Sequence, residues 1–126
     1  MSSDLRHRLG ALGERLAADH LARLGFEIVE RNYRTRWGEL DIVAFDGLTL
    51  TFCEVKTRRL TATGSGSGPL DAVGTGKRSR VRKMAGSWLI ERRERPYAVS
   101  VRFDAIGVTV DALGRLVRLE HVEDAF

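Results

Sequence analysis

The 126-residue sequence is 43% apolar and 30% charged, with a formal net charge of +4. This length predicts a single domain, 1–126, and the composition excludes disorder throughout. No apolar run reaches the roughly 18 residues of a membrane span, Met1–Arg6 lacks the layout of a secretory signal, and the single cysteine, Cys53, cannot form an intrachain disulfide. We therefore expect a cytoplasmic protein without a membrane partner, whose mild positive charge favours polyanions.

The N-terminal part carries the pattern of an amphipathic helix, expected over residues 5–24. Its apolar residues recur at steps of three and four, as one buried helix face requires. They are Leu9, Leu12, Leu16, Ala17, Leu21 and Leu24. Gly25 follows as a stop signal. A first strand is expected at 27–33, before the basic and aromatic segment 34–37.

Two β-rich runs follow, at residues 39–45 and 48–57. The only residues between them are Asp46-Gly47, a pair that predicts a hairpin with a two-residue turn. Such a turn sets Phe45 opposite Leu48, and this pair fixes the register of the whole hairpin.

In this register Asp41 lies opposite Phe52, and Glu39 lies opposite Glu54. Because alternate residues of a strand share a face, Asp41, Glu54 and Lys56 fall on the same face of the sheet. Asp41 and Glu54 are then diagonal neighbours, roughly 7 Å apart at Cβ or less. The two carboxylates are predicted to reach a common ion.

The remaining elements complete an α/β pattern. A glycine- and serine-rich stretch at about 61–76 has little to bury and is expected to form a flexible loop. Residues 77–94 follow as a second amphipathic helix with a basic outer face. Alternation predicts a strand at 97–103, and 116–121 is a candidate for a last short strand. This order predicts a central mixed sheet flanked by two helices.

Asp41, Glu54 and Lys56 are charged residues in strands that otherwise have a buried pattern, where an uncompensated carboxylate costs several kcal/mol. Neighbouring carboxylates raise each other's pKa unless a cation neutralises them. A hard divalent cation, Mg²⁺ or Mn²⁺, takes such oxygen ligands. Lys56 would then orient a water or offset charge on a phosphate. The simpler interpretation is a surface ion pair between Glu54 and Lys56.

Glu14 is a further candidate ligand. Ala17, Ala18 and Leu21 follow it at three, four and seven residues, which places it at the border of the helix face that packs on the sheet. Small alanines would allow that helix to approach closely. The alternative is a solvated glutamate paired with neighbouring arginines. Glu39 is a second alternative, as an additional ligand or as the cap of its strand.

Several motifs occur in order over nearly the whole chain. They are Gly13-Glu14 with Ala17, Leu24-Gly25-Phe26, Asn32-Tyr33-Arg34, Gly38-Glu39-Leu40-Asp41-Ile42-Val43, Phe52-Cys53-Glu54-Val55-Lys56-Thr57-Arg58, Lys77-Arg78 and Arg102-Phe103-Asp104. In these motifs the sequence resembles the bacterial YraN-like family, which is similar to PD-(D/E)xK nucleases and related in pattern to Holliday-junction resolvases. Leu40 stands where the name of the nuclease motif has proline.

The resemblance implies a restriction-endonuclease-like central mixed β-sheet flanked by two α-helices. It implies a nuclease site at Glu14, Asp41, Glu54 and Lys56, with the backbone carbonyl of Val55 as a further metal ligand. The resemblance implies an activity but no substrate. Our leading hypothesis is hydrolysis of phosphodiester bonds in structured or branched DNA, in preference to RNA, with Mg²⁺ or Mn²⁺ as the cofactor. A homodimer would suit a two-stranded junction.

Basic residues flank the predicted site and can neutralise phosphates without reading bases. They are Arg34, Arg36, Arg58, Lys77, Arg78 and Arg80. Trp37 is either a stacking surface for a base or a core anchor. The histidines His7, His20 and His121 lack zinc-site spacing and are expected to be surface or structural residues. Two alternatives stay open: a non-catalytic nucleic-acid-binding or assembly protein on the same fold, and a module that binds an acidic protein.

Overall fold

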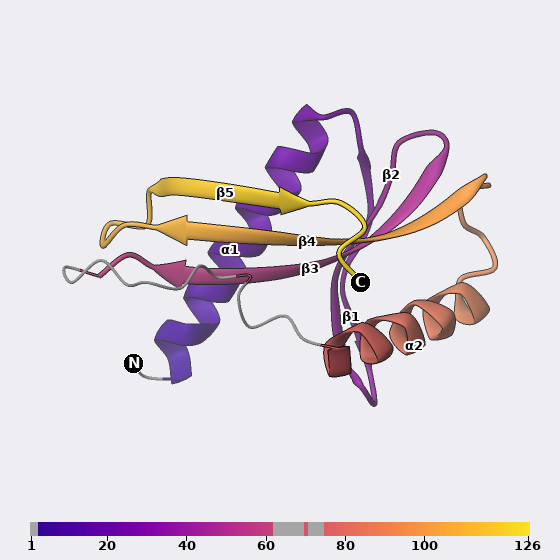
Figure 1. The fold of residues 1–126 in the computed structure, drawn as a ribbon, viewed down its shortest axis with the longest axis horizontal. Helices are drawn as coiled ribbons and strands as arrows, with labels where there is room; N and C mark the ends of the chain where they lie inside the picture. Colours follow the sequence, from indigo (N-terminus) through magenta and orange to yellow (C-terminus); the bar gives the residue numbers. More distant parts are fainter. Residues whose placement is uncertain (1–2, 62–69, 71–74) are drawn as a thin grey trace.

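The computed structural model describes residues 3–61, 70 and 75–126, which form a five-stranded sheet and two helices (Figure 1). The elements are α1 (Ser3–Arg23), β1 (Glu27–Thr35), β2 (Gly38–Phe45), β3 (Thr49–Arg59), α2 (Thr75–Glu91), β4 (Ser100–Val110) and β5 (Leu116–Val122). The strands lie in the order β1-β2-β3-β4-β5, and all neighbours are antiparallel except β3 and β4, which are parallel. The expected α/β fold with a mixed sheet is confirmed. Within the described residues, neither helix is long and apolar enough to cross a membrane.

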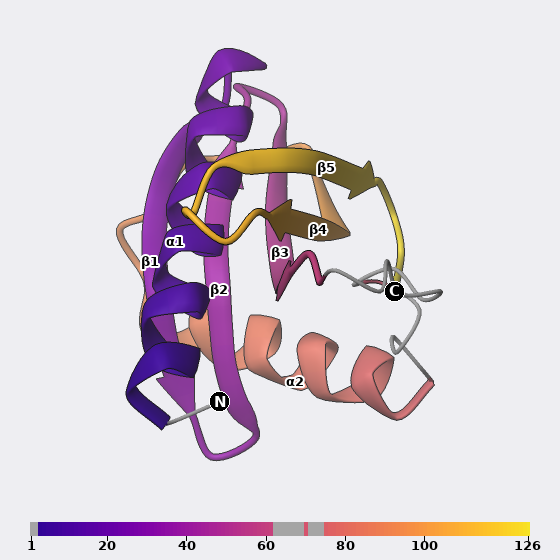
Figure 2. The same cartoon turned by 90° about the vertical axis from the view of Figure 1, so that its left-hand side faces the viewer.

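The helices lie on different sides of the sheet, so the core has two parts (Figure 2). The cluster beneath α1, which we call the α1 cluster, includes Ala17, Leu21, Ile42, Ala44 and Cys53. The cluster beneath α2, the α2 cluster, includes Leu40, Val43, Phe52, Met84 and Trp88. Neighbouring residues of β3 therefore face different helices, as strand geometry requires.

The helices agree closely with the expected ranges. α1 ends two residues before Gly25, whose φ of +98° is a conformation that glycine adopts readily. α2 spans Thr75–Glu91 rather than 77–94. Of the loop expected at 61–76, residues 62–69 and 71–74 lie outside the described residues, and the last two belong to α2.

The hairpin between β2 and β3 differs from the expected one by two residues of register, because Phe45 pairs with Leu50 and not with Leu48. The Asp46 carboxylate accepts hydrogen bonds from the backbone N–H groups of Leu48 and Thr49, at 2.9 and 2.7 Å. These bonds stabilise a longer connection than a two-residue turn. Side chains alternate with period two, so a shift of two residues does not by itself move a side chain to the other face.

The β2–β3 ladder ends at the pair Ile42 and Cys53. One step beyond this pair, Asp41 falls opposite Glu54 and not opposite Phe52. The expected diagonal placement of the two carboxylates, like the expected pair of Glu39 with Glu54, is therefore wrong in detail. Beyond the ladder, the Val55 N–H of β3 donates its hydrogen bond to the Asp41 side chain, at 2.7 Å.

The strand expected at 97–103 is wrong at both ends, since β4 runs from Ser100 to Val110. Tyr97 and Val99, which belong to the alternating pattern, are 91% and 75% exposed. β4 has a strand on each side, and its residues Asp104–Val110 are buried without interruption. A strand covered on both faces shows no alternation, so periodicity does not predict the bounds of β4. β5 confirms the expected last strand.

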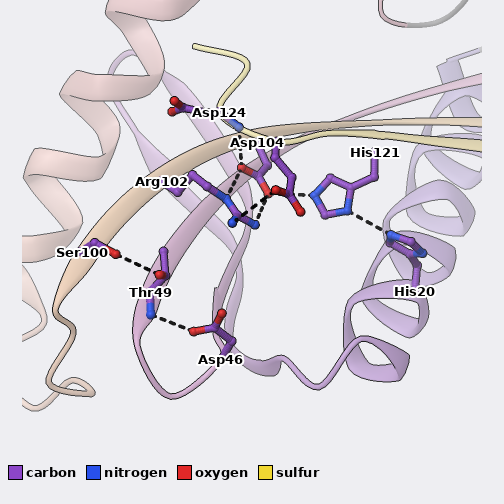
Figure 3. Close-up of polar contacts among 9 residues, drawn as sticks. His20, Asp46, Thr49, Ser100, Arg102, Asp104, His121 and Asp124 are labelled. Atoms are coloured by element: carbon purple, nitrogen blue, oxygen red, sulfur yellow. Dashed lines mark hydrogen bonds and ion pairs between the residues drawn. The ribbon is translucent and has the colours of Figure 1, made fainter.

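A buried polar network joins α1, β4 and β5 (Figure 3). Asp104, 0% exposed, accepts two hydrogen bonds from Arg102, both at 2.9 Å, one from His121 Nε2 at 2.7 Å and one from the Asp124 N–H at 3.0 Å. His121 Nδ1 lies 3.0 Å from His20 Nε2 of α1. Burial raises the pKa of Asp104, but the bonds from His121 and Arg102 outweigh burial and hold that pKa below its usual value. His20 and His121 thus have a structural role, as expected.

Candidate metal and nucleic-acid site

Three carboxylates from two elements meet between α1 and the first half of β2. Glu14 belongs to α1, Glu39 and Asp41 belong to β2, and one oxygen of each lies within 4.8 Å of the others. We call these residues the acidic triad. The structure thus brings together Glu14 and Asp41, both predicted as ligands, with Glu39, which the sequence offered as an alternative.

Glu14 reaches the sheet because α1 packs closely at the preceding residue. Gly13 is buried, and a Cβ at this position would overlap Oγ1 and Cβ of Thr57 on β3. Ala17 and Ala18 continue the buried helix face one turn later. The expected close approach of the helix is present, and a glycine rather than an alanine is its tightest point.

Gly13→Ala is expected to lower the free energy of unfolding by about 1–3 kcal/mol, because the added methyl group forces α1 away from β3. The same movement carries Glu14 away from Asp41 and weakens binding of Mn²⁺. Urea unfolding and Mn²⁺ titration measure the two effects. Gly10→Ala is the matched control, since a Cβ at position 10 meets no atom within 4 Å. Equal behaviour of the two variants would contradict the role of the close contact.

Asp41 lies at the point of β2 where the regular alternation of side chains between the α1 cluster and the α2 cluster is interrupted. Strict alternation would place Leu40 on the same side as Ile42 and Ala44, yet Leu40 packs in the α2 cluster and the other two pack in the α1 cluster. β2 therefore rotates between Leu40 and Ile42. At this point the Asp41 carboxylate turns towards Glu14 of α1.

The environment of Asp41 disfavours a bare negative charge. Asp41 is only 9% exposed, and its Oδ2 accepts a hydrogen bond from the Val55 N–H at 2.7 Å. Burial raises the pKa of Asp41 to about 8; the Val55 bond opposes this rise, and the charges of Glu54, Glu14 and Glu39 add to it. Asp41 therefore holds a proton at neutral pH in the absence of metal. A bound cation would replace this proton and neutralise the carboxylate. Buried carboxylate oxygens of this kind fit a hard divalent ion.

Asn32 of β1 positions two members of the acidic triad. Its side-chain amide donates hydrogen bonds to Glu14 Oε2 at 2.6 Å and to Glu39 Oε1 at 2.8 Å. Its backbone has φ of +56°, a left-handed conformation in which asparagine is several-fold enriched. Asn32 is not among the site residues expected from the sequence, although an asparagine within an expected strand is a signal of such a local conformation.

Glu54 and Lys56 approach the same region from β3. With Asp41 and Trp37 they border a pocket of about 290 Å³, which we call the site pocket. Lys56 Nζ lies 3.6 Å from Glu54 Oε1, so the ion pair of the simpler interpretation is present. Glu54 is only 8% exposed, however, and this pair is not a surface pair. Glu54 lies outside the acidic triad, and Val55 offers its N–H to Asp41.

A second pocket, of about 450 Å³, lies on the α1 side of the triad. Arg34 borders it, with a side chain 82% exposed and its Nε 3.5 Å from Glu39 Oε2. Arg6 and His7 from the first turns of α1 border it as well, and sequence reasoning missed both. Glu39 borders both pockets, so the triad lies between two hollows with cationic side chains.

The other predicted phosphate-binding residues have different settings. Arg80 of α2 is exposed and borders the site pocket. Arg36 and Arg78 are exposed, and Arg58 is half-buried. Lys77 belongs to α2, but its side chain lies outside the described residues. Cationic groups therefore border the site from β1, β3 and α2.

Comparison with known proteins gives a family and no activity. The model of the family described as "Uncharacterised protein family UPF0102" matches residues 13–108. A UPF0102 protein of Frankia casuarinae is 49% identical over 94% of this chain and 95% of its own length. One from Frankia alni is 44% identical over the full length of both chains. One from Mycobacterium tuberculosis is 47% identical over 94% of this chain and 91% of its own.

Proposed function

The chain belongs to the uncharacterised protein family UPF0102, and we propose that it is a metal-dependent endonuclease that hydrolyses phosphodiester bonds in structured or branched DNA. The observation that carries this proposal is the acidic triad, whose buried Asp41 borders one pocket with Lys56. A mixed sheet with a helix on each side is compatible with the restriction-endonuclease-like fold of such enzymes. We expect the protein to act in the cytoplasm and on DNA rather than RNA; a homodimer would suit a two-stranded junction.

The donor set supports Mg²⁺ or Mn²⁺ as the cofactor. Glu14, Glu39 and Asp41 would hold the ion, and Glu54 and the Val55 carbonyl are the additional ligands that we propose from β3. When bound, the ion would supply Lewis-acid activation of the phosphodiester and neutralise charge in the transition state.

The side chains of the protein would do the positioning. Asn32 holds two of the triad carboxylates, and the Val55 N–H orients the third. Lys56, half-exposed at the site pocket, would offset the negative charge that develops on the scissile phosphate. Arg34 and Arg80 would neutralise flanking phosphates from the two pockets. Contacts of this kind recognise the shape of DNA rather than its sequence.

Cleavage of DNA tests the proposal directly. The protein is incubated with Mg²⁺ or Mn²⁺ and with flap, junction, single-stranded and duplex substrates. Asp41→Asn and Lys56→Met are each expected to lower the rate by about 100-fold or more, since each removes charge that stabilises the transition state. Asp19→Asn is the matched control, because Asp19 is an exposed acid of α1 outside both pockets.

The outcomes separate the candidate functions. Metal-dependent cleavage that is lost in the two site variants and kept in the control supports the endonuclease. Binding to DNA without cleavage of any substrate would replace it by the non-catalytic nucleic-acid-binding protein. Absence of affinity for any nucleic acid would leave the module that binds an acidic protein.

A further inference from the structure

Trp37 lies at the turn between β1 and β2 and borders the site pocket beside Asp41 and Lys56. The turn is held by Thr35, whose Oγ1 accepts a hydrogen bond from the Trp37 N–H at 3.0 Å and donates one to the Gly38 carbonyl at 2.9 Å. Gly38 has φ of +129°, which a side chain would make unfavourable. The backbone at Trp37 is therefore held in place, and its side chain borders the pocket that contains the candidate catalytic groups.

The surroundings of the indole suit an aromatic ligand. Trp37 is half-buried against the α2 cluster, and the exposed Arg36 guanidinium lies 4.5 Å from the centre of its ring. Trp37 also borders an apolar hollow of about 400 Å³ with Lys83 and with Ile90, which is 78% exposed. Trp37 thus borders two hollows, with Arg80 at one and Lys83 at the other. Proteins that bind single-stranded nucleic acid combine aromatic side chains of this kind with neighbouring cationic groups.

We propose that the DNA strand is unpaired where it crosses the acidic triad, and that one of its bases stacks on Trp37. A base in an intact duplex is hidden between its neighbours and cannot reach a side chain at a pocket rim. An unpaired base on the indole would keep its own phosphate within reach of Lys56 and Arg80, which border the same pocket. This inference rests on the proposed function and names the substrate class: single strands, flaps and unpaired junction arms, rather than continuous duplex.

Intrinsic fluorescence measures the stacking without relying on cleavage. The sequence has two tryptophans, and Trp88 is 1% exposed with its Nε1 bonded to Glu30 at 2.8 Å. Quenching by DNA therefore reports on Trp37. A titration with a ten-nucleotide oligo(dT), in Ca²⁺ instead of Mg²⁺, is expected to quench the emission. A blunt duplex of the same length is expected to bind more weakly and to quench little.

Substitutions identify the ring as the binding group. Trp37→Leu is expected to weaken binding of a labelled oligo(dT) by about 10-fold, within the range measured for base–aromatic stacking. Trp37→Phe keeps an aromatic face and is expected to stay within about threefold of the wild type. Tyr97→Leu removes an aromatic side chain that is 91% exposed and does not border the site pocket, and it is the matched control. Thermal melting confirms that each variant is folded.

Equal affinity for oligo(dT) and duplex, or full affinity in folded Trp37→Leu, would overturn the inference. Failure of the proposed enzymatic function has a different signature. If no substrate is cleaved but oligo(dT) still quenches Trp37 and binds Trp37→Leu weakly, the single-strand site stands and the endonuclease does not.

Discussion

Asp41→Asn is expected to raise the free energy of unfolding of the metal-free protein by about 3–5 kcal/mol near pH 8, although it removes a candidate ligand. Burial is the main cause that raises the pKa of Asp41 from 3.8 to about 8, so the ionised carboxylate is poorly tolerated in the fold. Asparagine has the same shape without the charge, and its amide oxygen can still accept the Val55 N–H.

The pH dependence has a definite sign. Asp41 has its ordinary pKa of 3.8 in the unfolded chain and a pKa of about 8 in the folded protein, so the folded state binds the proton more tightly. The stability that this group contributes is fully present below about pH 4 and is lost as the pH rises through about 8. The asparagine variant has no such group at position 41, and this part of the pH dependence disappears.

Urea unfolding in EDTA, at a series of pH values from about 5 to 9, measures this difference. The gap between the variant and the wild type should widen as the pH rises. Asp19→Asn changes the same functional group at an exposed position of α1 and should stay parallel to the wild type. Curves for Asp41→Asn and the wild type that run parallel over the whole range would contradict the raised pKa.

A gain in stability when the charge is removed and the shape is kept is the expected signature of a functional carboxylate. Asp41→Asn should combine higher metal-free stability with loss of the stabilisation that Mn²⁺ gives the wild type. A purely structural aspartate would behave in the opposite way, because its replacement would cost stability under all conditions. The two measurements together therefore separate a ligand from a structural residue.

The faces of the hairpin could be predicted from sequence because side-chain alternation tolerates an even error in register. The hydrogen bonds of the Asp46 side chain stabilise a longer connection, and Phe45 pairs with Leu50 instead of Leu48. Asp41 is nevertheless close enough to Glu54 of β3 for the Glu54 charge to raise its pKa. A shift of one residue would have placed it on the opposite face. The expected approach of Asp41 to Glu54 therefore does not depend on the exact length of the turn.

The membership of the acidic triad could not be predicted in the same way. Glu39 joins Asp41 and Glu14 because β2 rotates at Leu40 and because Asn32 holds two of the glutamates. Both causes are tertiary, since they depend on how β1, β2 and α1 meet. Periodicity placed Glu14 correctly at the border of its helix, but it carries no information on rotation within a strand.

Asp104→Asn is the substitution for which we expect the largest loss of stability, about 3–5 kcal/mol. Asp104 is fully buried and accepts hydrogen bonds from Arg102, His121 and the backbone of Asp124 (Figure 3). The amide of asparagine has a single acceptor oxygen, and its NH₂ group would face donors. The Arg102 charge would then keep only its longer contact with the exposed Glu123 carboxylate, at 3.6 Å. Urea unfolding near pH 7 measures the loss.

Acid should reduce this loss. Hydrogen bonds from His121 and Arg102 keep the pKa of Asp104 below its usual value in spite of burial, so its contribution is present above the unfolded pKa and is lost as the pH falls through the folded one. The free energies of unfolding of the wild type and Asp104→Asn should therefore converge in acid, because the wild type loses a favourable charge. Those of the wild type and Asp41→Asn should also converge there, because the wild type loses an unfavourable charge. One carboxylate stabilises the fold as an anion, and the other destabilises it.

The double variant Arg102→Gln/Asp104→Asn tests whether charge compensation is the cause. Removing both partners leaves no uncompensated charge in the network, so the double variant should lose less stability than the sum of the two single variants. Strict additivity would mean that Arg102 and Asp104 act independently. Mn²⁺ should still stabilise the folded double variant, because the network joins β4, β5 and His20 and contains no member of the acidic triad. Loss of that Mn²⁺ response would instead show that the network positions α1, and with it Glu14, at the candidate site.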